Sequence, residues 1–317
     1  MTRDDLLQML ERWRASGWLH RLGLAFARFV ADSDATAPAS LLLGAAWVAH
    51  LEGLGHGALP TDDRPCDLPA FLGWPPEAGD DLRMATALWR TGTAGGALDW
   101  HGCPSVEIEP SDDSGSSPLV LSAGLLYLRR YWRYETQVAA RIRARTSFAA
   151  DDIDRHLARK TLDLLFPPEP AAPAEPDWQK IACALALRGR LTLVTGGPGT
   201  GKTYTAARLL VLLRELHAGP QPLRVALAAP TGKAAARLRQ SISNALQGLN
   251  QLQPADGALA PAKTLHALLG AQPGTRRFRH DVARPLDVDL LIVDEASMVN
   301  LEMMAHLLGA LPTAARL

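Results

Sequence analysis

Gly196-Gly197-Pro198-Gly199-Thr200-Gly201-Lys202-Thr203 decides the fold, because these eight residues satisfy the pattern G-x-x-x-x-G-K-[ST]. The residues 191–195 before them are mostly apolar and predict a short buried strand. Apolar residues recur at helical spacing after them, over 206–216. A strand, a glycine-rich loop and a helix in this order predict a phosphate-binding loop.

The loop predicts a site for the phosphates of ATP. Glycines allow several backbone N–H groups to turn toward one anion, and the start of the next helix adds partial positive charge. We expect Lys202 to contact the β- and γ-phosphates, and the Thr203 hydroxyl to coordinate Mg²⁺. Gln179 is predicted to bind the adenine edge, because an amide both donates and accepts hydrogen bonds. A Rossmann site is excluded, since position 202 is lysine where that fingerprint needs glycine.

A second apolar run, Leu290–Val293, ends in the carboxylates Asp294 and Glu295. It predicts a buried strand that delivers its last residues to the carboxyl edge of a parallel sheet, where the phosphates would bind. We expect Asp294 to hold Mg²⁺, and Glu295 to orient and deprotonate the attacking water. The predicted catalytic residues are therefore Lys202, Asp294 and Glu295.

A further strand followed by a helix is predicted at 224–238, with Pro230, Thr231, Gly232 and Lys233 at the junction. This helix start could hold a nucleic-acid phosphate, or Thr231 could simply cap the helix. Thr264-Leu265-His266 and the basic-aromatic cluster 276–280 are weaker signals. The cluster is either a solvated loop or a contact with DNA or a neighbouring subunit.

Composition limits the class of protein. The 317 residues have a formal net charge of zero, so any contact with nucleic acid must be local. The three cysteines lack C-x-x-C spacing, no signal-peptide pattern is present, and the apolar run 41–51 is too short to span a bilayer. We therefore expect a cytoplasmic protein that does not enter a membrane.

A proline-rich stretch, residues 166–176, predicts a linker between two domains. The domain of residues 1–165 is expected to be mostly helical, with a small β element within 105–128, and it shows no catalytic constellation. The domain of residues 177–317 contains the predicted ATP site. The predicted fold class is α/β.

The motifs together resemble those of superfamily-one DNA helicases, and within them the RecD family, the alpha subunits of the RecBCD enzyme (exodeoxyribonuclease V). The strings that carry the resemblance are Asp177–Lys180, Gly196–Thr203, Ala229–Ala235, Thr264–His266, Asp294–Val299 and, upstream, Leu125–Glu135. The resemblance implies a RecA-like P-loop NTPase domain and ATP-driven 5′ to 3′ translocation at duplex ends in recombinational DNA repair. It also implies a heterotrimer with beta and gamma subunits, the gamma subunit receiving the N-terminal domain. Candidate contacts with single-stranded DNA then become Pro230, Thr231, Lys233, Thr264 and His266.

The resemblance also implies parts that the sequence does not contain. The sequence stops at Leu317, before a Gly-Asp-x-x-Gln-Leu motif and a second RecA-like domain. We therefore expect the N-terminal part of a longer protein, with an incomplete motor domain and no autonomous activity. Ala315–Leu317 is predicted to begin the strand between the phosphate-loop strand and the Asp294 strand. Two alternatives stay open: another P-loop enzyme, such as a kinase or a remodelling ATPase, and a non-catalytic module for nucleotide binding and subunit docking.

Overall fold

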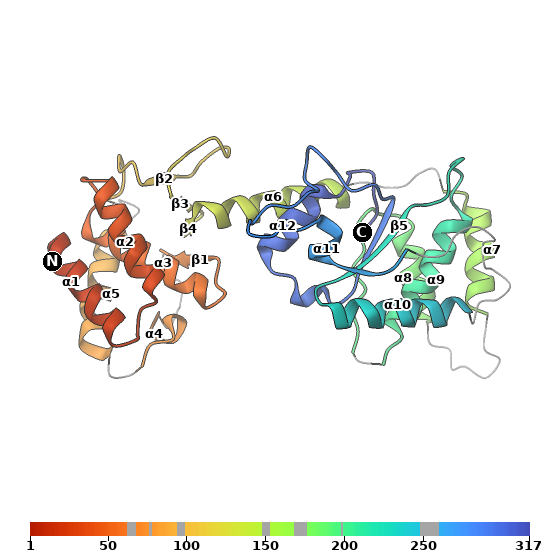
Figure 1. Ribbon diagram of the computed structural model, residues 1–317, viewed down its shortest axis with the longest axis horizontal. Coiled ribbons are helices and arrows are strands. Elements are labelled where there is room, and N and C mark those ends of the chain that lie inside the picture. Colours follow the sequence, from red (N-terminus) through yellow and green to blue (C-terminus); the bar gives the residue numbers. More distant parts are fainter. Residues whose placement is uncertain are drawn as a thin grey trace. The chain divides into compact units, whose positions relative to one another are not determined.

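The computed structural model describes residues 1–61, 68–75, 78–93, 99–147, 153–167, 176–197, 199–247 and 260–317 (Figure 1). The chain divides into two compact units, Met1–Glu135 and Thr136–Leu317. No helix in these described ranges is both long and apolar enough to cross a membrane.

The first unit is built mainly from helices. They are α1 (Arg3–Ala15), α2 (Arg21–Ser33), α3 (Ala39–Gly53), α4 (Leu68–Leu72) and α5 (Gly79–Thr93). Helix α1 begins with a reciprocal capping box between the Thr2 and Asp5 side chains. Helix α3 is buried on all sides from Ser40 to Leu51, so the core of the unit forms around it.

A four-stranded sheet completes the first unit. Its strands are β1 (Ala58–Pro60), β2 (Val106–Ile108), β3 (Leu119–Ser122) and β4 (Leu125–Leu128), in the order β1-β4-β3-β2. Strand β2 is parallel to β3, and the other pairs are antiparallel. The predicted small β element within 105–128 is confirmed, while β1 was not predicted.

Helix α6 (Arg129–Thr146) contains the boundary between the units. The second unit continues with α7 (Arg155–Leu165), α8 (Trp178–Ala186), α9 (Lys202–Glu215), β5 (Val225–Ala229), α10 (Gly232–Gln247), β6 (Lys263–Thr264), α11 (Leu265–Leu269), β7 (Leu290–Val293), the 3₁₀ helix Ala296–Met298 and α12 (Leu301–Ala310). Helices α7 and α8 pack against α9, and α9 packs against α10 (Figure 1). The α/β class is therefore confirmed.

The second sheet is parallel and has the order β6-β5-β7. It extends beyond β7 through a parallel bridge between Leu290 and Arg316. Leu317 continues this extension, because its N–H donates to Arg190 O over 2.8 Å and its carbonyl accepts from Thr192 N over 2.9 Å. The predicted position of residues 315–317 between β7 and the phosphate-loop segment is thus confirmed.

The predicted strand at 191–195 is wrong. The structure assigns no strand there, and Leu193 is 79% exposed rather than buried. Among the described residues, only Leu317 bonds to the backbone of this segment in a ladder-like way, through Arg190 and Thr192. A parallel strand needs a ladder of partners along its length, so an apolar sequence does not make a strand without them.

The two compact units divide at a different place from the predicted domains. Helix α7 precedes the predicted linker, yet Ala158, Leu162, Leu165 and the following Phe166 belong to the same hydrophobic cluster as Leu210 of α9. By these contacts α7 is part of the second unit. Residues 168–175 of the predicted linker lie outside the described residues, and the linker stays a prediction.

Candidate nucleotide and nucleic-acid site

The phosphate loop leads directly into α9. Gly199 and Gly201 have φ angles of 77° and 79°, in the left-handed region that glycine adopts without steric cost. Gly201 is also the N-cap of α9, so the loop turns sharply into the helix and leaves the first N–H groups of the helix facing the loop. Pro198 lies outside the described residues.

Lys202 extends along the loop. Its Nζ donates to the carbonyl oxygens of Gly196 and Gly197, over 2.7 and 2.8 Å. Thr200 closes the same turn, because its hydroxyl donates to Gly197 O over 2.9 Å. The ammonium therefore lies beside the loop backbone, where an anion in the loop would meet it. Thr203 is half-buried in the first turn of α9.

Gln179 contacts the phosphate loop. Its Nε2 donates to Thr200 O over 3.3 Å, and a Cβ added to Gly201 would lie only 2.6 Å from that same nitrogen. Helix α8 is held in place by its N-cap Asp177, whose carboxylate accepts from Lys180 N. The structure thus places the predicted adenine-binding residue beside the predicted phosphate-binding loop.

Asp294 and Glu295 leave β7 at the carboxyl edge of the sheet. Asp294 N donates to Ala228 O of β5, and Asp294 Oδ1 accepts from Glu295 N over 2.9 Å. Glu295 adopts a left-handed conformation with φ of 52°, which is uncommon for a residue other than glycine. Asp294 is half-buried and Glu295 is exposed.

The sheet order relates the two acids to the phosphate loop. Arg316 and Leu317 lie between β7 and the segment at Arg190–Thr192, and all these segments run parallel. Residues 315–317 therefore lie between β7 and the segment that leads into the phosphate loop. That the loop and the two acids meet at the same edge of the sheet stays a prediction.

A groove of about 490 Å³, here called the edge groove, gathers several predicted residues. Pro230, Thr231 and His266 line it together with members of the basic-aromatic cluster, Arg276, Arg277 and Phe278. The groove also reaches Met298, Val299 and Asn300, which follow the two acids. Lys233 and Thr264 do not line this groove. The proximity of the cluster to Thr231 could not be predicted from their positions in the sequence.

Both predicted threonines cap helices. The Thr231 hydroxyl accepts from Ala234 N over 3.2 Å at the start of α10, and the Thr264 hydroxyl accepts from Ala267 N over 3.1 Å at the start of α11. Capping and ligand contact are compatible, because Thr231 remains exposed in the groove. The His266 ring lies 6.1 Å from the ring of Phe278.

One contact beside the site was not predicted. The Arg208 guanidinium of α9 lies 4.1 Å from the ring of Tyr204 and 4.4 Å from the ring of Phe166, and its Nη2 donates to the Tyr204 hydroxyl over 2.6 Å. Tyr204 directly follows Thr203, so this stack ties the end of α7 to the helix of the phosphate loop. The spacing of 204 and 208 on one helix is the only sequence signal for it.

Comparison with known proteins agrees with this division into units. Residues 15–127 match the family described as the N-terminal domain of RecBCD enzyme subunit RecD, and residues 179–317 match an AAA domain. RecBCD enzyme subunit RecD of Haemophilus influenzae is 37% identical over 232 residues, which cover 69% of this chain and 35% of that protein. The corresponding subunit of Mycolicibacterium smegmatis is 44% identical over 212 residues, which cover 64% and 35%.

A more distant similarity is to the ATP-dependent RecD2 DNA helicase of Deinococcus radiodurans. It is 41% identical over 127 residues, which cover 40% of this chain and 14% of that helicase. The chain spans about a third of the length of the RecD subunits that it matches, as the 35% coverage of both shows.

The phosphate loop, the parallel sheet and the match over 179–317 define a P-loop NTPase domain of the AAA class. The first unit matches the N-terminal domain of RecD. With both units matched, and with RecD subunits similar over up to 69% of its length, the chain belongs to the RecD family.

Proposed function

We propose that this chain provides the first motor domain of an ATP-dependent DNA helicase subunit. In this proposal the subunit moves 5′ to 3′ on single-stranded DNA at duplex ends, within a heterotrimeric helicase-nuclease of recombinational repair. The observation that carries the proposal is the phosphate loop, in which Lys202 Nζ bonds to the loop backbone, next to a parallel sheet whose strand β7 leads into Asp294 and Glu295. Family membership supports the choice of a helicase.

The residues of the loop fit ATP with Mg²⁺. A side chain at Gly201 would meet Gln179, so glycine at this position lets Gln179 lie against the loop. Lys202 would exchange its bonds to the Gly196 and Gly197 carbonyls for phosphate oxygens. Thr203 and Asp294 would hold Mg²⁺, which supplies positive charge to the phosphates. Glu295 would then accept the proton of the attacking water.

The edge groove suits single-stranded DNA. Arg276 and Arg277 provide cations for phosphates, and Phe278 and His266 provide ring faces for bases. Thr231 at the start of α10 supports a phosphate contact through its backbone and hydroxyl. Because the whole chain has no net charge, this local cluster is the basis of the proposed affinity.

We place the contact with the gamma subunit on the first unit. Helix α2 exposes Leu22 and Phe29, which are 50% and 54% exposed, and Phe29 stacks on Phe26 with ring centroids 6.0 Å apart. An apolar stripe of this kind on a helix is typical of a protein interface. The beta subunit would complete the heterotrimer.

Two substitutions test the ATP chemistry. Lys202→Gln should abolish hydrolysis, because the γ-phosphate loses its charged partner. Glu295→Gln should retain nucleotide binding and slow hydrolysis by a factor of at least about 100, the lower end for loss of a general base. The measurement is ATP turnover with and without single-stranded DNA, in the chain assembled with the beta and gamma subunits, beside binding of a fluorescent ATP analogue.

Stimulation by single-stranded DNA separates the proposal from its alternatives. A kinase or a remodelling ATPase should be indifferent to DNA. A non-catalytic docking module should bind nucleotide and assemble with the beta and gamma subunits, yet leave their ATP turnover unchanged when Lys202 is replaced. Normal turnover of the Lys202→Gln assembly would refute the assigned role of the loop.

A further inference from the structure

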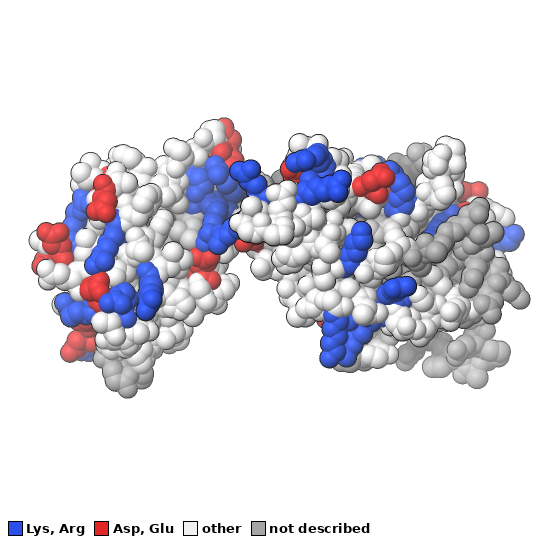
Figure 2. Space-filling model, in the orientation of Figure 1, with Lys and Arg blue, Asp and Glu red and all other residues white. Residues whose placement is uncertain are grey.

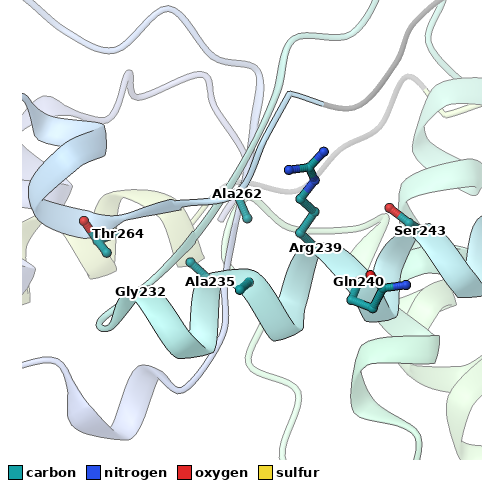
Figure 3. A pocket seen from close by; sticks show the side chains of 8 residues that line it. Gly232, Ala235, Arg239, Gln240, Ser243, Ala262 and Thr264 are labelled. Atoms are coloured by element: carbon teal, nitrogen blue, oxygen red, sulfur yellow. The ribbon is translucent and has the colours of Figure 1, made fainter.

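A second groove runs along one side of α10. It has a volume of about 530 Å³, and we call it the α10 groove. It is lined by Gly232, Ala235, Ala236, Arg239, Gln240, Ser243, Ala262 and Thr264 (Figure 3). Apart from Gly232, at the helix start predicted to hold a phosphate, and Thr264, none of these residues was predicted to contact a ligand.

At two places in the sequence, one residue lines the α10 groove and its direct neighbour lines the edge groove. Thr231 lines the edge groove, and the next residue, Gly232, lines the α10 groove. Leu265 lines the edge groove, and the preceding Thr264 lines the α10 groove. Both grooves therefore border the starts of α10 and α11.

The lining favours an anionic polymer. Helix α10 carries the cations Lys233, Arg237 and Arg239 and no carboxylate, in a chain whose net charge is zero. The face drawn in Figure 2 shows lysine and arginine side chains in the region of α10. The other lining groups are small side chains, hydroxyls and an amide, which leave room for a sugar-phosphate backbone and offer it hydrogen bonds.

Arg239 is the charged group of the α10 groove. Its side chain projects from the middle of α10, on the same side as Ala262 (Figure 3). Within the described ranges, no residue accepts a hydrogen bond from its guanidinium or forms an ion pair with it, so it is available to a ligand. A guanidinium binds phosphate through two parallel hydrogen bonds. From Gly232 to Ser243 the helix rises about 16 Å, which is long enough for several nucleotides.

We propose that the α10 groove binds the backbone of single-stranded nucleic acid as a continuation of the edge groove, with Arg239 contacting a phosphate. This inference rests on the proposed DNA-binding function and extends the DNA site beyond the predicted residues. It gives the strand a route along α10, away from the sheet edge. It also assigns Arg239 and Ser243 a role that Arg237, on the same helix outside the groove, does not share.

The test is binding of fluorescent oligothymidylates of graded length to this chain, measured by anisotropy over a series of salt concentrations. Arg239→Gln should weaken binding several-fold and reduce the steepness of the log-affinity against log-salt plot by about 0.7, the value for one phosphate contact on a single strand. Arg239→Lys should restore most of the affinity, and Ser243→Asp should weaken it. Arg237→Gln is the matched control and should leave affinity and slope close to those of the unaltered chain.

The length of the oligothymidylate gives a second test of the inference. The effect of Arg239→Gln should vanish for oligomers too short to extend beyond the edge groove. Equal behaviour of Arg239→Gln and Arg237→Gln would overturn the inference and leave the edge groove intact. Displacement of the oligomer by polyglutamate at a similar concentration would show general binding of anions and would overturn both this inference and the proposed DNA site. Failure of the unaltered chain to bind any oligothymidylate would overturn both this inference and the proposed DNA site.

Discussion

At the scale of single residues, the proposed nucleotide site depends on one position without a side chain. Gly201 is the N-cap of α9, has a φ of 79°, and would place a Cβ 2.6 Å from Gln179 Nε2. Glycine is therefore needed there for two reasons, the backbone conformation and the space that Gln179 occupies. A Cβ added to the nearby Gly199 would meet no atom within 4 Å, so glycine is needed at that position only for its backbone conformation.

Gly201→Ala should therefore weaken nucleotide binding more than Gly199→Ala. Both variants add strain of about 1 kcal/mol for a left-handed residue. Gly201→Ala in addition displaces Gln179 from the loop. Titration of each variant with a fluorescent ATP analogue measures the difference, and equal losses would show that Gln179 does not matter.

At the scale of elements, α7 is held on α9 by the stack around Arg208. The guanidinium lies between the Phe166 ring, just past α7, and the Tyr204 ring of α9. Leu162 and Leu165 of α7 add apolar contact within the same cluster. The stack therefore links the phosphate-loop helix to a helix that precedes the predicted linker.

Arg208→Ala should lower the free energy of unfolding of the second unit by about 1 to 3 kcal/mol, since two cation–π contacts are lost. Denaturant unfolding measures the change. Arg237→Ala, an exposed arginine on α10, is the control and should change stability by less than about 0.5 kcal/mol. A double-mutant cycle with Phe166→Leu isolates the contact to α7, and a coupling energy near zero would contradict the assigned role.

The elements also show what the sequence could predict. Signals within one segment were sufficient for the glycine loop before α9 and for the strand and helix at 224–238, which are β5 and α10. The strand at 191–195 was predicted wrongly, because strand formation depends on partners elsewhere in the chain. The apolar face of α7 could not reveal which core it joins. The edge groove brings together residues 230, 266 and 278 from different elements, so only the fold could show it.

At the scale of the whole molecule, the two units have separate cores. In the first unit the main cluster of buried residues runs from Leu6 to Leu128, beside a smaller one of Val120, Tyr127 and Trp132, and the clusters of the second unit run from Ala158 to Ala315. The first core holds most of the tryptophans, and the clusters of the second unit lie in the part of the chain that holds the phosphate loop. Because the cores are separate, we expect the stability of each unit to respond to a different condition: pH for the first unit and nucleotide for the second.

His50 makes the first unit sensitive to acid. It is buried, its Nδ1 accepts from His20 N over 3.1 Å, and its Nε2 contacts Leu72 O at 3.0 Å, which fixes the neutral form with the proton on Nε2. Burial, more than the nearby His20 ring, lowers the pKa of His50 below its ordinary value of 6.5. The unfolded chain therefore takes up the proton first, and stability is lost as the pH falls below 6.5.

Calorimetry of the whole chain should accordingly show two transitions that respond to different conditions. Lowering the pH from 7 to 5 should lower the midpoint of the first unit, and His50→Gln should remove most of this shift, because glutamine offers an acceptor and a donor but does not titrate. Saturating ATP with Mg²⁺ should raise only the midpoint of the second unit, by linkage to binding, which amounts to about 2.7 kcal/mol at 100 times the dissociation constant. A single transition that nucleotide and acid shift together would show that the units unfold as one, and that the ATP site is coupled to the RecD N-terminal domain.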